Sequence, residues 1–253
     1  MEHLEHCDLL AGEVKRFAEL IDAGPGSAGR LDVPVPSCPG WSVGDLTVHL
    51  GTVHRWAEHL VRARAPKRIP SSEMGLGAAD PSAAWLRAGG EALVATLRAV
   101  GPEVPMWAWG ADQHARFWSR RQLHETLVHR ADVELALGLE PVAEPAVVAD
   151  AIDEFLVNLS GAAYFSPRVT SLRGDGKRLS LRAIDEDREW SVTLQPESFE
   201  VGGPVSAPDA TLVAPALTLL LVLYRRRPID AVGVLATGDR SLIEMWWANS
   251  ALE

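Results

Sequence analysis

The sequence predicts an α+β protein in which a four-helix bundle is followed by a small α/β domain. Two observations support this fold class. Apolar residues recur at helical spacing through the first two thirds of the 253-residue chain, whereas alternating patterns occur only in the last third. A third observation concerns chemistry: all eight histidines lie within residues 1–129, so any imidazole chemistry belongs to the helical part.

Four long amphipathic segments predict the bundle. The second begins with a capping-box pair, Ser42 and Asp45, and the third begins at Asp80, an N-cap that precedes a proline. Gly138 is the expected C-cap of the fourth. Helices of this length joined by loops are typical of a bundle. The expected helices cover residues 2–23, 43–65, 81–100 and 117–137.

The last third changes character after a fifth expected helix, Pro145 to about Leu159. Two alternating segments separated by an acidic turn predict a β-hairpin. We place the domain boundary near Ser166 and Pro167, so that the bundle domain covers residues 1–165 and the α/β domain covers 166–253. The expected elements are strands at 178–184, 190–194, 211–213 and 234–237, and helices at 215–226 and 239–249.

The composition indicates small-molecule partners. With 24 Lys and Arg against 34 Asp and Glu, the net charge of −10 argues against nucleic acid or anionic lipid as a partner. The longest apolar run, 214–224, is too short to cross a bilayer. Cys7 and Cys38 form neither a disulfide framework nor a CxxC motif, which favours a reducing cytoplasm, and Cys38 is expected to be a packed free cysteine.

Helical geometry selects two of the histidines. At about 100° per residue, His49 lies at the centre of the apolar face of the second helix. Glu125 and His129 share a face of the fourth helix with apolar side chains. His54 and Glu58 fall among polar neighbours and are expected to form a solvated surface pair. The histidines other than 49 and 129 are expected mainly at the surface.

A carboxylate buried at Glu125 requires a cation, a proton or a hydrogen-bond network. Arg121 and Gln122 are near enough to form a structural polar cluster with it. Alternatively, His49, Glu125 and His129 supply three ligands in a bundle core, which suits zinc with an open position or a non-haem Fe(II) site. Spacing alone does not decide between the two interpretations.

Three stretches carry a resemblance to a known family: Pro39–Leu50, Val53–Trp56 and Leu123–Glu134. In order and spacing they resemble the mycothiol-dependent maleylpyruvate isomerase family, whose N-terminal domain is a DinB-like four-helix bundle. The segment 209–247 is similar to the small C-terminal α/β domain of that family. The chain departs from the pattern at Ala131, where the family has an aromatic residue.

The resemblance implies a zinc-dependent enzyme, or one that uses another divalent metal, with mycothiol as co-substrate. Its metal ligands would be His49, Glu125 and His129. A thiol bound to such a metal loses its proton near neutral pH. The thiolate then adds to a small electrophile, in cis–trans isomerisation or S-transfer. The expected partners are this thiol and the electrophile, without nucleic acid or membrane, and the expected state is a monomer or homodimer.

Further site residues are expected around these ligands. Arg226 aligns best with an arginine of the family and would hold a carboxylate, although it and its two arginine neighbours could instead cap a helix C-terminus. Asp132 would orient His129 or act as a base. Trp56 lies on the same face of its helix as His49, and Trp118 lies on the same face as Glu125 and His129. Both would line the cofactor pocket, unless they are core residues.

Two rival functions stay open at this point. One is a non-catalytic metal-binding bundle that acts as a binding or regulatory module. The other is an iron oxygenase with a two-histidine, one-carboxylate site. Metal identity and thiol affinity discriminate between these and the thiol-dependent enzyme.

Overall fold

The computed structural model describes residues 1–22, 29–76 and 79–252. The chain forms two compact units, one of residues 1–108 and 112–141 and the other of residues 109–111 and 142–253. The predicted α+β class is confirmed, with a helical first unit and a sheet in the second. The boundary expected at residues 165 and 166 lies inside the second unit, because the helix at 145–158 packs with that unit.

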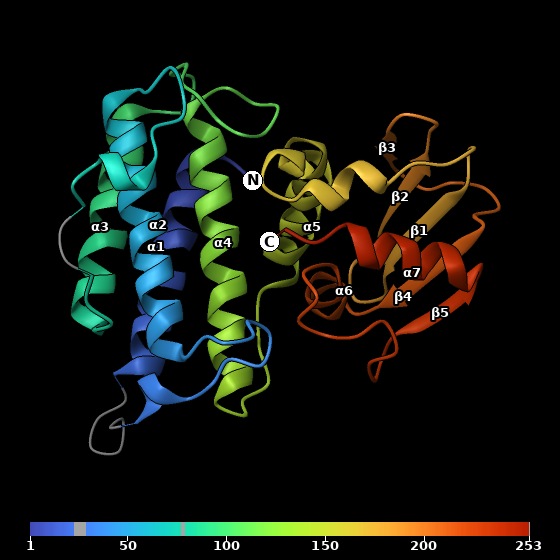
Figure 1. Cartoon of the computed structure of the whole chain (residues 1–253), viewed down its shortest axis with the longest axis horizontal. Helices are drawn as coiled ribbons and strands as arrows, with labels where there is room; N and C mark the ends of the chain where they lie inside the picture. Colours follow the sequence, from blue (N-terminus) through green and yellow to red (C-terminus); the bar gives the residue numbers. More distant parts are fainter. Residues whose placement is uncertain (23–28, 77–78, 253) are drawn as a thin grey trace. The chain divides into compact units, whose positions relative to one another are not determined.

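The first unit is the expected four-helix bundle (Figure 1). Helix α1 packs mainly against α3 and α4, and α2 packs against the same two helices. The hydrophobic core between them includes Phe17, Leu46, Leu50 and Leu86, none of which is exposed. The helices are α1 (His3–Ile21), α2 (Val43–Ala63), α3 (Ala83–Val100) and α4 (Ala115–Ala136).

Local hydrogen bonds explain where these helices begin and end. The capping box of α2 is confirmed, because the Asp45 N–H donates to Ser42 Oγ at 3.1 Å and the Ser42 N–H donates to the Asp45 carboxylate at 2.9 Å. The N-cap of α3 is Ser82 rather than Asp80, because the Asp80 carboxylate accepts from the Ser82 N–H instead. Gly138 follows α4 with φ of 72°. The end of the first helix expected at residue 23 lies outside the described residues.

The second unit contains a five-stranded sheet in the order β3-β2-β1-β4-β5. The expected hairpin is β1 (Arg178–Ala183) and β2 (Arg188–Leu194). Strand β4 (Ala210–Ala214) runs parallel to β1, and β5 (Leu235–Gly238) is antiparallel to β4. Strand β3 (Phe199–Gly202) was not predicted, because its alternation of apolar and polar residues covers only four positions at a mostly exposed edge of the sheet.

Three helices pack with this sheet unit: α5 (Pro145–Asn158), α6 (Ala216–Leu223) and α7 (Arg240–Asn249). Helix α5 contacts α6 through Phe155 and Tyr224, whose rings are 4.9 Å apart. The Asp153 carboxylate on α5 also accepts from the Trp190 indole N–H of β2 at 2.6 Å. These contacts make α5 part of the second unit.

None of the described helices combines the length and the apolar character that a membrane span requires.

The expectation that six histidines lie mainly at the surface is wrong for four of them: His3, His6, His54 and His124 are buried. His54 has no exposed surface and bonds to Thr126 Oγ1 of α4 at 2.9 Å. Its expected partner Glu58 binds Arg62 and Thr96 instead. The prediction failed because the buried face of α2 is centred near His54, which is buried together with Leu50 and Val61, whereas His49, expected at the centre of the apolar face, is 35% exposed.

The buried position of His54 predicts a pH-dependent stability. Burial outweighs the attraction of Glu125 and lowers the pKa of His54 to about 3. In the unfolded chain the same group takes up a proton below about pH 6.5. Protonation therefore favours the unfolded state increasingly as the pH falls from 6.5 toward 3.

We expect His54→Gln to weaken this pH dependence while its amide still donates to Thr126. Between pH 6.5 and 5, the free energy of unfolding of the wild type should fall by about 1.5 kcal/mol more than that of the variant. Urea titrations at the two pH values measure the difference. Equal pH dependence in the two proteins would contradict a neutral His54 in the folded state.

Candidate metal centre

Three predicted residues from two helices converge in the first unit. His49 lies on α2, and Glu125 and His129 lie on α4. Glu125 Oε1 is 3.5 Å from His49 Nε2 and 3.2 Å from His129 Nε2. One possible ligand atom from each of the three side chains lies within 4.8 Å of the other two, which is near enough for a single metal ion. Among the described residues, this is the group of three or more His, Cys, Asp or Glu side chains that meets this spacing.

The spacing of these atoms fits a divalent metal. Two ligands at 2.0–2.1 Å from a tetrahedral zinc lie about 3.3 Å apart. The oxygen-to-nitrogen distances of 3.2 and 3.5 Å lie on either side of that value. They are longer than the roughly 2.7–2.9 Å of a charge-assisted hydrogen bond. The donor set and the spacing therefore suit a cation held between the three side chains.

Glu125 directs one oxygen to the two imidazoles because its other oxygen is already bonded. Arg121 donates from Nη2 to Glu125 Oε2 at 3.0 Å, and the Arg121 side chain is almost fully buried. Burial alone would raise the pKa of Glu125, but His129, His49 and Arg121 outweigh it and hold the pKa well below its usual range. The carboxylate is therefore ionised. The polar partner expected at Arg121 is present, yet it leaves Oε1 facing the histidines.

His129 is oriented by a second carboxylate. Its Nδ1 lies 2.9 Å from Asp132 Oδ2, and Asp132 has no exposed surface. This contact turns Nε2 toward Glu125. Burial would lower the pKa of His129, but the carboxylates of Glu125 and Asp132 raise it to about 9. The surroundings thus favour a positive charge at this point, which a proton or a metal can supply.

The loop that precedes α2 forms one wall of the site. The Trp41 ring lies 5.0 Å from the His49 ring. In the same loop, Ser37 Oγ donates to Asp132 Oδ1 at 2.5 Å, and Cys38 Sγ lies 3.8 Å from Asp132 Oδ2. The contacts with Asp132 could not be predicted from the sequence, because no periodicity relates a loop residue to a helix residue 95 positions later.

Family models match both parts of the chain. One describes the mycothiol maleylpyruvate isomerase N-terminal domain and matches residues 10–134, and another describes the C-terminal domain of the same family and matches residues 146–244. The chain belongs to the mycothiol-dependent maleylpyruvate isomerase family. The resemblance noted in the sequence is therefore confirmed.

Two solved structures share the fold of this family member. A mycothiol-dependent maleylpyruvate isomerase matches with a TM-score of 0.54, and a histidine-to-alanine variant described under the same name matches with 0.55. Each is 14% identical, and the match covers 94% of this chain and 93% of the other. No curated protein matches the chain.

The two tryptophans expected to line the pocket of this family member differ in exposure. Trp118 is fully buried, and its indole N–H donates to the Trp107 carbonyl at 3.0 Å. Its ring packs against that of Trp56, 5.2 Å away, which is partly exposed. Trp118 is therefore a core residue in the structure, and of the two only Trp56 has surface available to a ligand.

The arginines at the end of α6 also divide into different roles. Arg225 donates from Nε to the Trp247 carbonyl at 3.0 Å and from Nη2 to the Ala248 carbonyl, so it ties α6 to α7. Arg226 donates from Nη1 to the Tyr224 carbonyl at 2.8 Å.

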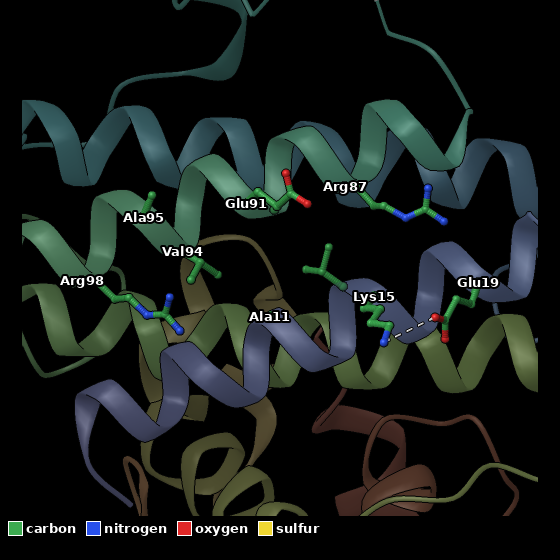
Figure 2. A pocket seen from close by; sticks show the side chains of 10 residues that line it. Ala11, Lys15, Glu19, Arg87, Glu91, Val94, Ala95 and Arg98 are labelled. Atoms are coloured by element: carbon green, nitrogen blue, oxygen red, sulfur yellow. Dashed lines mark ion pairs between the residues drawn. The ribbon is translucent and has the colours of Figure 1, made fainter.

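A surface groove between α1 and α3 contains none of the predicted site residues (Figure 2). Its apolar lining consists of small residues such as Ala11, Val14 and Gly90, and Arg87 and Arg98 lie toward opposite ends of the groove. The basic groups of the groove already have acidic partners: Arg87 binds Asp22, Arg98 binds Asp8, and Lys15 pairs with Glu19. The groove therefore adds nothing to the candidate metal centre.

Proposed function

We propose that this family member is a metal-dependent enzyme that activates mycothiol for addition to a small electrophile. His49, Glu125 and His129 would hold the metal, with zinc as the expected ion. The observation that carries the proposal is the convergence of two imidazoles on a single carboxylate oxygen at 3.2 and 3.5 Å. Three protein ligands leave a position for a substrate atom.

A divalent metal at this site would lower the pKa of a bound thiol, so that the nucleophilic thiolate would be available near neutral pH. The surrounding residues position the ligands and admit the reactants. Glu125 supplies the negative charge, and Arg121 and Asp132 orient the ligand atoms. The His49 side chain is 35% exposed, so small molecules reach the site on its side. Trp41 flanks that opening with an apolar surface.

Two reaction types follow from an activated thiol. In isomerisation, the thiolate adds to the double bond of an unsaturated diacid, the resulting single bond rotates, and elimination returns the thiolate and the trans isomer. In S-transfer, the thiolate displaces a leaving group or opens an epoxide and stays bound to carbon. We expect the enzyme to act in the cytoplasm as a monomer or homodimer.

One preparation tests the metal and the thiol together. Elemental analysis of freshly purified protein measures the bound metal, and mass spectrometry screens thiol conjugation and isomerisation with mycothiol and a panel of electrophiles. About one equivalent of zinc with thiol-dependent turnover supports the proposal. Bound zinc without thiol affinity would favour a non-catalytic binding module, and iron with O₂ dependence would favour an oxygenase.

Replacing Arg226 should weaken substrate binding selectively, because we propose that its guanidinium holds a carboxylate of the substrate or the thiol. We expect Arg226→Gln to raise KM by roughly tenfold or more, since a lost charge-assisted hydrogen bond costs about 1.5–3 kcal/mol. Steady-state kinetics with the electrophile found in the screen measure this. Arg227→Gln is the neighbouring control, and a raised KM in that variant alone would move the role to Arg227.

A further inference from the structure

We propose that Ser37 is a positioning residue for His129 and acts through Asp132. The proposal rests on the metal site put forward above. The two oxygens of the Asp132 carboxylate have different partners: Oδ1 accepts from Ser37 Oγ at 2.5 Å, and Oδ2 lies 2.9 Å from His129 Nδ1. A residue of the loop before α2 is thereby connected to a ligand on α4.

The orientation of His129 depends on this carboxylate. A histidine that donates its Nδ1–H presents the lone pair of Nε2 as the ligand. His129 Nε2 is the atom that lies 3.2 Å from Glu125 Oε1. If the carboxylate of Asp132 rotated, the hydrogen bond to Nδ1 would weaken and the imidazole ring would gain freedom. The rotation of Asp132 therefore controls how well the ligand is aligned.

Ser37 provides a short-range restraint on that rotation. A buried carboxylate requires donors, and a short bond between a hydroxyl and an ionised oxygen is among the stronger hydrogen bonds. Asp132 has no exposed surface, so water does not substitute readily for the hydroxyl. Cys38 also contacts Asp132, but the 3.8 Å distance and the weak thiol donor make it the lesser partner.

The backbone of the loop holds Ser37 in place. The Val35 N–H donates to the Trp41 carbonyl at 2.9 Å, and the Cys38 N–H donates to the Val35 carbonyl at 3.0 Å. The Val35 side chain is buried, which anchors the loop in the bundle. Because the loop continues directly into α2, it also leads to the ligand His49. One rigid turn thus connects the helices that carry the three ligands.

The test measures zinc affinity by competition with a chromophoric chelator. We expect Asp132→Asn to weaken zinc binding by roughly 10- to 100-fold, the usual effect of losing a partner of a ligating histidine. Ser37→Ala, one bond further out, should weaken it by roughly 3- to 10-fold. Ser37→Thr keeps the hydroxyl and should restore affinity to within about twofold of the wild type. Cys38→Ala, in the same loop, should also stay within about twofold.

A second measurement follows the hydrogen bond itself. In zinc-loaded protein labelled with ¹⁵N-histidine, the Nδ1–H proton of His129 should exchange slowly with water, because Asp132 holds it in a buried place. The signal is assigned by its loss in His129→Gln. Ser37→Ala should speed its exchange, and Ser37→Thr should not. A general loss of stability would not speed exchange in Ser37→Ala alone. Thermal unfolding of each variant measures any such loss.

The outcomes separate this proposal from the one on which it rests. A wild type that binds no metal would overturn both. A wild type that binds zinc, with Ser37→Ala at unchanged affinity and unchanged Nδ1–H exchange, would overturn the positioning role alone. An equal loss of affinity in Ser37→Ala and Cys38→Ala would assign the effect to loop packing and also overturn the specific role of Ser37.

Discussion

His49→Ala is expected to remove the bound metal from the purified protein, from about one equivalent to less than roughly a tenth of one after dialysis, because only two protein ligands remain. His49 is the ligand contributed by α2, so the two remaining ligands both come from α4. Thiol-dependent turnover should be lost with the metal. Elemental analysis and the conjugation assay measure the two effects.

The fold should survive this substitution, because the His49 side chain is partly exposed and contributes little to the core. His59→Ala is the matched control: it removes an imidazole from the same helix, where His59 contacts Arg62 at the surface. This control should keep its metal and its activity. Unchanged metal content in His49→Ala would contradict the proposed ligand set.

Arg130→Ala is expected to lower the free energy of unfolding by about 3–5 kcal/mol. The Arg130 side chain is 2% exposed, and its guanidinium binds the carboxylates of Glu13 on α1 and Glu134 on α4, the latter at 2.5 Å. Truncation would leave both acids without this partner in a buried place. Burial already raises the pKa of Glu134, despite the attraction of Arg130. Urea unfolding near neutral pH measures the loss.

A neighbouring arginine provides the control for Arg130. Arg16 also pairs with Glu13, at 3.6 Å, but its side chain is 55% exposed. Surface ion pairs contribute about 0–1 kcal/mol, so Arg16→Ala should change the stability little. A similar loss in both variants would contradict the view that burial, rather than charge pairing itself, makes Arg130 important.

The main helices were predictable because each carries its own apolar stripe and its own end signals. Ser42 and Asp45 lie three positions apart and form the capping box that their identities predict. Asp80 was a weaker case, since Ser82 two residues later competes for the same role and becomes the N-cap. Strand β3 was missed because its alternation covers only four residues, which are mostly exposed at the sheet edge.

The histidines show the limit of a single-helix argument. The structure brings the side chains of His49 and His129 to Glu125, but His49 is 35% exposed and lies at the edge of the buried face of α2, not at its centre as the apolar stripe predicted. His54 was assigned to the surface together with Glu58, yet Leu50, Ala57 and Val61 on its own side of α2 are buried with it. A second neighbour, α4, covers that side and offers Thr126 as a partner. A helical wheel describes one helix and contains no information about how many neighbours it has.

The sequence by itself determined the α+β class, the family, and the placement of the histidines in the helical part, because periodicity, capping and motif spacing are local properties of the chain. Only the tertiary structure decided that Ser37 reaches Asp132 and that Trp41 lies against His49. The first contact joins the loop before α2 to α4, and the second joins the same loop to α2. Their geometry depends on how the bundle packs, which no local pattern records.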